Sequence, residues 1–253
     1  MKKYIITRLG LEFPEKNGNG KHLENQKDYV LETIMEMLDF TYHSILNQTA
    51  KDIVWVFFTG SRFNDVHRDI IEDVVNIPVV FTKEVNFGVT RKLWDQESIV
   101  LRLDADDFMH PELIEKVESN LMEKYNGNNI VICNPTKGYK LFPDMTLTEF
   151  DAPHIALGQG VLSNCGANPM HNHTQLVQRI SETFPGRDVV VNNLETDERL
   201  YLYRRHKKAH SFIFDANYKE KEKLSKEKTE KILAEFNATS TPFYMKNNEK
   251  NNS

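Results

Sequence analysis

The sequence is poor in cysteine, in long apolar runs and in net charge of either sign. Its only cysteines, Cys133 and Cys165, lie far apart and form no metal-binding motif, so we expect a reduced, cytoplasmic protein without structural disulfides. No apolar run approaches the ~20 residues that a membrane-spanning helix requires. The formal net charge of -5 argues against a general nucleic-acid-binding protein.

What the sequence contains is an alternation of apolar runs with amphipathic segments. Nearly continuous apolar runs at 53–58 and 99–103 predict buried strands, and apolar residues at helical spacing within 26–46 predict a long helix. Further strands are predicted at 4–7, 78–81, 130–133, 138–142, 189–191 and 200–203, further helices at 66–75, 90–97, 111–121 and 173–184, and a long functional loop at 151–170. This order predicts an α/β fold with a central, mostly parallel mixed sheet flanked by helices.

The C-terminal region differs in composition from the rest of the chain. Residues 217–236 are rich in Lys and Glu with sparse apolar positions, which predicts an exposed helix lying on the body. The Asn- and Lys-rich end predicts disorder. We therefore expect a main domain at 1–216, a charged C-terminal helix at 217–240 packed on or beside it, and a disordered tail at 241–253.

The most informative stretch is the apolar run that ends in three carboxylates, Asp104, Asp106 and Asp107. Ligands of open α/β sheets bind beyond the carboxyl ends of such strands. Carboxylates concentrated there repel one another unless a cation neutralises them. Mg²⁺ or Mn²⁺ suits these hard oxygen ligands, and Mg²⁺ is usually held by one or two carboxylates together with substrate phosphates. The sequence therefore predicts a metal-bound diphosphate at this strand end.

Five segments carry a family resemblance when they are taken in chain order. They are Ile5–Arg8, Ser44–Thr49 with the following strand, Asn86–Gly88 with Arg91, Arg102–Asp107, and Tyr203–His206. Over roughly residues 4 to 212 they resemble the GT-A fold glycosyltransferases of the family 2 type, and the first and fourth segments look most like its rhamnosyltransferase branch. The resemblance implies a Rossmann-like nucleotide-sugar-binding fold.

The resemblance implies a metal-dependent, inverting glycosyltransferase of carbohydrate biosynthesis. Such an enzyme moves a sugar from a nucleotide-diphosphate donor to a hydroxyl of a glycan or another acceptor, with Mn²⁺ or Mg²⁺ as cofactor. Because side chains alternate along a strand, Asp104 and Asp106 are expected on the same side, Asp106 as metal ligand and Asp104 on the metal or the ribose. Asp107 is expected to orient the site or to cap the next helix. The alternative for the trio is an acidic helix start, since carboxylates favour helix N-termini.

Further site residues follow from the resemblance. Contacts to the donor nucleotide are implied for Thr7, Arg8, Asn86, Gly88, Arg91, Asp104 and Arg204. His206 is the third candidate metal ligand, because a neutral imidazole suits Mn²⁺ and its cationic neighbours suit a diphosphate. His210 is the fallback ligand, and a solvated basic strand end is the alternative interpretation.

The general base departs from the family pattern. Where the family has a carboxylate at the start of the helix below the acceptor, this chain has His171 and His173. An imidazole can act as a general base near neutral pH. Alternative bases are Asp151, Glu195 and Asp197, and the two histidines could instead bind the acceptor or cap the helix.

Two other functions stay open from the sequence. The carboxylates could form a Ca²⁺ or structural metal site in a non-catalytic carbohydrate-binding module, although their spacing fits no EF-hand loop. Alternatively, the same fold could glycosylate modified DNA bases, as some virus-encoded transferases do. The basic patch Arg204–Lys208 permits that function and the net charge opposes it, so nucleic acid is a possible but not a favoured partner.

Overall fold

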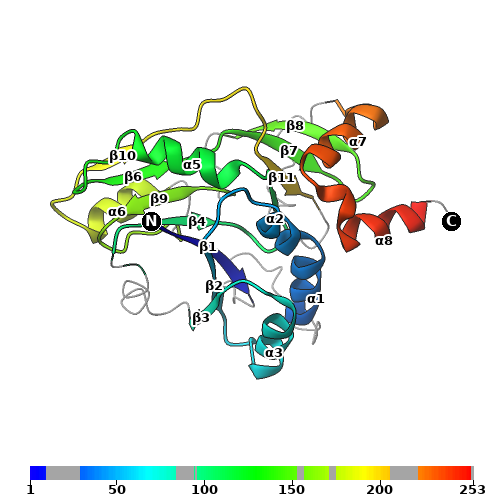
Figure 1. Ribbon diagram of the computed structural model, residues 1–253, viewed down its shortest axis with the longest axis horizontal. Coiled ribbons are helices and arrows are strands. Elements are labelled where there is room, and N and C mark those ends of the chain that lie inside the picture. The colour runs from blue at the N-terminus through cyan, green and yellow to red at the C-terminus, as the bar shows by residue number, and fades with distance from the viewer. Residues whose placement is uncertain are drawn as a thin grey trace, which may run out of the picture.

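The computed structural model describes residues 1–9, 29–83, 94, 96–152, 157–170, 175–205 and 222–251 (Figure 1). Its strands are β1 (Lys2–Leu9), β2 (Ile53–Thr59), β3 (Val79–Lys83), β4 (Ser98–Arg102), β5 (Phe108–Met109), β6 (Ile130–Cys133), β7 (Lys137–Leu141), β8 (Leu147–Asp151), β9 (Gly160–Ser163), β10 (Val189–Val191) and β11 (Tyr201–Arg204). Its helices are α1 (Tyr29–Glu36), a π-helical turn (Met37–Thr41), α2 (Tyr42–Leu46), α3 (Asp65–Val74), α5 (Leu113–Met122), α6 (Leu176–Thr183), α7 (Lys226–Glu235), a short 3₁₀ helix (Ala238–Ser240) and α8 (Pro242–Asn251).

A seven-stranded sheet in the order β10-β6-β9-β4-β1-β2-β3 forms the centre of the molecule. Its neighbouring strands run parallel except at β9, which is antiparallel to both β4 and β6. Helices α1, α3 and α5 pack on one face of this sheet, and α6 packs on the other. The predicted mixed α/β architecture, with a mostly parallel central sheet flanked by helices, is therefore confirmed.

The central strands are buried on both faces, which explains their continuous apolar runs. On β1, Ile5 belongs to the large cluster beneath α1, α3 and α5, whereas Ile6 packs on the opposite face with Val56 and Val100. Both isoleucines are fully buried. The same two-sided burial holds β4 in register with β1, and Ile6 pairs with Arg102 at the last position of β4. The residues after Arg102 therefore emerge at the carboxyl edge of the sheet.

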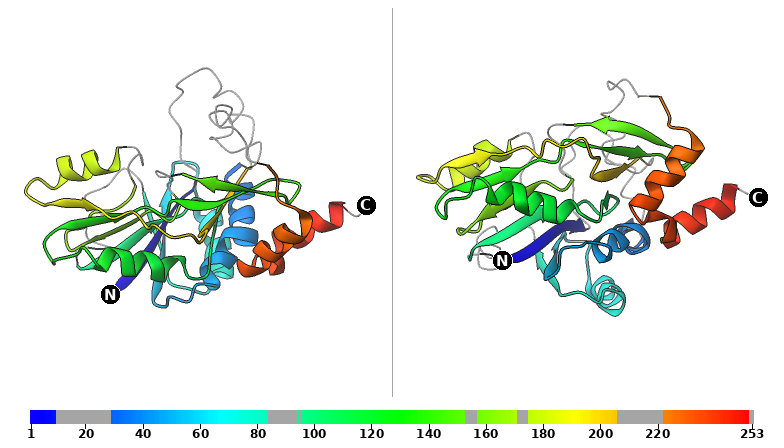
Figure 2. Two further views of the ribbon diagram at one scale, coloured as in Figure 1. Left: turned by 90° about the horizontal axis from the view of Figure 1, so that it is seen from above. Right: turned by 45° about the horizontal axis from the view of Figure 1, so that its top comes forward.

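A second, four-stranded sheet has the order β5-β11-β7-β8. Helix α7 covers one of its faces. Its residues Ile232 and Leu233, together with Phe236 directly after the helix, belong to a common core that includes Leu141 and Leu202. Figures 1 and 2 show α7 and α8 on the side of the molecule that carries this sheet. The charged segment thus contains an amphipathic helix that packs on the body, with an exposed face and a buried apolar stripe.

Three segments differ from the sequence predictions. The tail expected to be disordered contains α8, whose Phe243 packs on Phe40 with 4.9 Å between the ring centroids. The expected loop at 151–170 contains β9, a fully buried strand in the middle of the central sheet. The expected helix from Pro111 begins two residues later, at Leu113. Among the helices that are described, none combines the length and the apolarity needed to cross a bilayer.

Candidate functional site

The carboxylates after β4 lie on a turn, which we name the acidic turn (Asp104–Asp107). The backbone N–H of Asp107 donates to the carbonyl oxygen of Asp104 at 3.3 Å, so the chain reverses here instead of continuing as a strand. The expected alternation of Asp104 and Asp106 was therefore based on the wrong local geometry, because β4 ends at Arg102. Both side chains are partly exposed, whereas Ala105 and Asp107 are buried.

Asp107 fixes the acidic turn to the second sheet. Its side chain is 2% exposed, and its Oδ1 accepts a hydrogen bond from the backbone N–H of Arg204 at 3.2 Å. Burial raises the pKa of Asp107 well above its usual range, and repulsion from Asp106 and Asp104 adds to the increase. Asp107 thus joins the acidic turn to β11, and its expected role in orienting the site stays a prediction. It does not cap α5, whose N-cap position is Glu112 without a side-chain cap.

Asp104 forms an ion pair at the end of β4. The Nε of Arg102 lies 3.1 Å from Oδ1 of Asp104, and the Arg102 side chain is mostly buried. This guanidinium compensates one negative charge of the turn. A metal ion that binds here would therefore share Asp104 with Arg102. Asp106 belongs to the same turn as Asp104.

Two residues of β1 reach the same edge of the sheet. The fully buried hydroxyl of Thr7 donates to the carbonyl oxygen of Leu103 at 2.8 Å and accepts from Nε1 of Trp55 at 2.9 Å. The hydroxyl of Thr7 thus positions the end of β4 and is engaged within the protein, and the expected contact of Thr7 to the donor nucleotide stays a prediction. Nη2 of Arg8 donates to the carbonyl oxygen of Met170 at 2.6 Å, so this edge also holds the segment that ends at residue 170.

Arg204 is the last residue of β11 and lies next to the acidic turn. Its side chain is only 9% exposed. Its guanidinium carbon lies 4.0 Å from the ring centroid of Phe243 and 5.9 Å from that of Phe40, and its Nη1 lies 3.5 Å from Glu36. Burial lowers the pKa of Arg204, and the charges of Glu36 and Asp106 oppose that shift. This geometry does not favour the expected contact between Arg204 and the donor, because the guanidinium packs against two aromatic rings.

The alternative carboxylate bases are engaged elsewhere. Asp151 pairs with Arg199 at 2.6 Å on the second sheet, and the exposed Asp197 pairs with Lys137 at 3.1 Å. Glu195 lines a separate groove, described below. The remaining predicted site residues lie outside the described residues, namely Asn86, Gly88, Arg91, His171, His173, His206 and His210.

The donor set of the acidic turn fits a hard divalent cation held in part by its substrate. Within the described ranges, no three His, Cys, Asp or Glu side chains gather into a complete metal site. Two neighbouring, partly exposed carboxylates match the one or two that Mg²⁺ ordinarily takes from a protein, with phosphate and water oxygens completing the shell. Asp104 and Asp106 would provide these two oxygen ligands.

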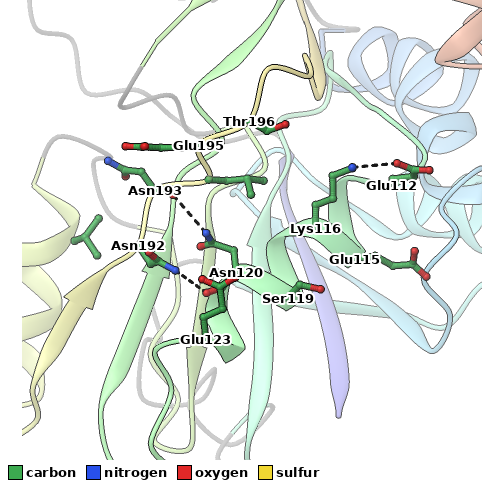
Figure 3. Close-up of a pocket in the computed structure, with 12 residues that line it drawn as sticks. Glu112, Glu115, Lys116, Ser119, Asn120, Glu123, Asn192, Asn193, Glu195 and Thr196 are labelled. Atoms are coloured by element: carbon green, nitrogen blue, oxygen red, sulfur yellow. Dashed lines mark hydrogen bonds and ion pairs between the residues drawn. The ribbon is translucent and has the colours of Figure 1, made fainter.

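A groove of about 910 Å³ runs between α5 and the segment Val191–Thr196 (Figure 3). Its polar lining includes Asn120, whose side-chain amide donates to the carbonyl oxygen of Asn193 at 3.4 Å, and Asn192, which donates to the carbonyl oxygen of Asn120 at 2.8 Å. None of the lining residues belongs to the acidic turn. The sequence did not predict this groove, because its two walls lie 72 residues apart in the chain.

Comparisons with known proteins give only distant likenesses. No family model matches the chain, and no curated protein sequence does. The solved structure of S. aureus TarS 1–349 in complex with UDP-GlcNAc has a TM-score of 0.40 at 12% identity, over 96% of this chain and 68% of that one. A Bacillus anthracis structure described as a glucose-1-phosphate thymidylyltransferase, in complex with a sucrose, has a TM-score of 0.38 at 11% identity, over 77% and 87% of the two chains. Scores of this size establish no family, so the functional argument depends on the residues themselves.

Proposed function

We propose that this protein is a GT-A type glycosyltransferase that moves a sugar from a nucleoside-diphosphate donor to an acceptor hydroxyl with Mn²⁺ or Mg²⁺. The observation that carries the proposal is the acidic turn at the carboxyl end of β4, next to β1 in the middle of a mostly parallel sheet. Ligands of open α/β sheets bind at this edge. The raised pKa of the buried Asp107 reflects both its burial and the negative charge of the partly exposed Asp104 and Asp106.

The residues of the site have distinct roles in this proposal. Asp106, with Asp104, would hold the cation, which when bound supplies charge stabilisation for the departing diphosphate. Thr7 and Asp107 keep the turn in place through hydrogen bonds to the backbone at Leu103 and Arg204. His206 as third ligand, and Asn86, Gly88 and Arg91 as donor contacts, are carried over from the sequence resemblance.

The acceptor base is proposed to be His171 or His173. The bond from Arg8 to the carbonyl oxygen of Met170 supports this choice, because it holds the residue before His171 at the carboxyl edge of β1. In comparison, Asp151 and Asp197 are already engaged in ion pairs on or beside the second sheet.

The proposal is tested with a panel of nucleotide sugars, with and without Mn²⁺. A donor that binds the native state raises its melting temperature, and the enzyme should then release a nucleoside diphosphate. Asp106→Asn should abolish both the Mn²⁺-dependent shift and the release while the unliganded melting temperature stays close to that of the wild type. Asp73→Asn, which changes an exposed carboxylate on α3, is the matched control.

The outcomes separate the competing functions. A wild-type response in Asp106→Asn would overturn the metal role of the acidic turn. Binding of a nucleotide sugar without turnover, with any hydroxyl acceptor offered, would favour the non-catalytic binding module. His206→Ala should weaken Mn²⁺-dependent binding more than His210→Ala, and the reverse order would assign the third ligand to His210.

A further inference from the structure

Helix α8 lies against the π-helical turn, far from it in sequence. Figure 1 shows α8, in red, on the side of the molecule where β11 ends. Phe243 of α8 packs against Phe40 of the π-helical turn, and Lys246 forms an ion pair with Asp39 of the same turn. The Phe243 ring also faces the guanidinium of Arg204, 4.0 Å from its centroid.

Arg204 connects α8 to the acidic turn. Its backbone N–H donates to the buried carboxylate of Asp107, and the charge of its guanidinium interacts with that of Asp106. Glu36, at 3.5 Å, contacts the same guanidinium from α1. A change in the position of this arginine would therefore act on the acidic turn through Asp107.

The π-helical turn contacts the acidic turn from another direction. The hydroxyl of the buried Thr41 donates to the carbonyl oxygen of Ala105 at 2.8 Å, and the Phe40 ring packs on Phe108 with 4.7 Å between centroids. π-helical turns inside helices are rare and occur frequently at functional sites. In this chain Phe40 of the π-helical turn contacts both Phe108 of the second sheet and Phe243 of α8.

We propose that Phe243 is a positioning residue: α8 holds Arg204 by a cation–π contact, and Arg204 in turn holds Asp107, and with it the acidic turn, in the orientation that metal and diphosphate binding require. The inference rests on the proposed function of the acidic turn. A desolvated guanidinium over an aromatic face is held more strongly than an exposed one, and Arg204 is mostly buried. The C-terminal helix α8 then helps to position the proposed active site.

The test replaces the ring but keeps apolar volume. Phe243→Leu should weaken the binding of Mn²⁺ with UDP, GDP or dTDP by about 10-fold, the usual effect of losing an outer-shell partner of a metal ligand. Phe243→Tyr keeps the aromatic face and should bind like the wild type. Tyr244→Leu removes the neighbouring half-buried ring of α8 and should lower the melting temperature without weakening binding. In an Arg204→Gln background, Phe243→Leu should add no further loss, because the two residues act through one contact.

Amide hydrogen exchange gives a second readout that does not depend on a ligand. Exchange at residues 104–107 and at the Arg204 amide should become faster in Phe243→Leu and stay unchanged in Tyr244→Leu. Equal effects of the two leucine variants on exchange and on binding would overturn the inference. If the wild-type protein binds none of the three diphosphates, the proposed function fails, and the exchange pattern alone decides whether Phe243 positions the turn.

Discussion

The hydroxyl of Thr41 is a single buried group on which the acidic turn depends. Thr41→Val keeps the shape of the side chain but leaves the Ala105 carbonyl without its hydrogen bond. We predict a loss of about 1–3 kcal/mol of unfolding free energy, measured by urea denaturation, because a buried acceptor is left unsatisfied. Thr41→Ser keeps the hydroxyl and should lose less. Equal stability of the valine and serine variants would contradict this role.

His110 should contribute to acid sensitivity. Burial lowers its pKa below the ordinary value of 6.5, while Glu112, Glu198 and Glu235 raise it and Lys116 lowers it further. Because the folded pKa is the lower one, the unfolded state binds more protons as the pH falls, so stability is present above the unfolded pKa and declines below it. Nδ1 of His110 also accepts the Glu112 N–H at 3.3 Å, a bond that protonation would remove.

We therefore predict that His110→Asn, which keeps a side-chain acceptor, flattens the decline in unfolding free energy between about pH 7 and pH 5. Urea denaturation at several pH values measures this slope. His43 and His67, whose pKa values burial also lowers, should retain their share of the decline. A slope unchanged from the wild type would contradict a contribution of His110 to acid sensitivity.

At this scale the sequence predicted the carboxylates of the acidic turn better than the contacts of the residues around it. Asp104, Asp106 and Asp107 were identified by type and order, and the structure places them together on one turn. The burial of Thr7 and Arg204 could not be predicted from the sequence. It depends on contacts with Leu103 and Trp55 for Thr7 and with Phe243 for Arg204. Partners so distant in the chain leave no local pattern.

Among the strands, β7 depends on a glycine for its approach to β11. A Cβ added at Gly138 would overlap ring atoms of the buried Tyr201. We predict that Gly138→Ala lowers unfolding free energy by about 1–3 kcal/mol, as overpacking generally does. Tyr201→Leu makes room for the added methyl group, so the double variant should lose less than the sum of the two single changes. Additive losses would show that Tyr201 is not the obstacle.

Strong periodicity predicted the elements well, and weak periodicity did not. The helix expected within 26–46 is present from Tyr29 to Leu46, but the π-helical turn inside it has no sequence signature. Strand β9 was missed because it is four residues long and lies in a Gly-, Pro- and Asn-rich stretch. Its burial comes from pairing with β4 and β6 and not from its own composition.

For the whole molecule, the C-terminal region should unfold together with the rest. Phe236 is fully buried and touches both His110 and Tyr139 edge-on, so it joins α7 to the segment before α5 and to the second sheet. We predict that Phe236→Ala lowers unfolding free energy by about 3–5 kcal/mol in a single thermal transition. Glu235→Ala, at the neighbouring exposed position, should change it by no more than about 0.5 kcal/mol. A separate early transition would instead indicate an independent C-terminal unit.

The sequence predicted the fold class of the molecule better than the way in which its parts pack together. Alternating strands and helices predicted an α/β fold, and that prediction is confirmed by the strand order. The charged helix was expected on or beside the main domain, but the packing of α7 on the second sheet and the presence of α8 were not predicted, because a composition dominated by Lys and Glu gives little indication of which surface the few apolar positions contact. Ile232, Leu233 and Phe236 are three such positions in a highly charged segment.

The central place of β1 has a consequence for biosynthesis. The ribosome makes β1 before its neighbours β2 and β4. Because Lys2 pairs with Ser98, β1 and β4 cannot pair until the chain has been made beyond Ser98. Until then, the edge of β1 that pairs with β4 is open to other chains, even when β2 covers the opposite edge, and an open edge of an apolar strand favours aggregation and chaperone binding. Pairing between strands so far apart in the chain also slows folding. The entropy cost of closing the loop between them comes before the contacts of the strand pair lower the free energy. A nascent chain stalled before β4 is therefore the state of this protein in greatest need of protection.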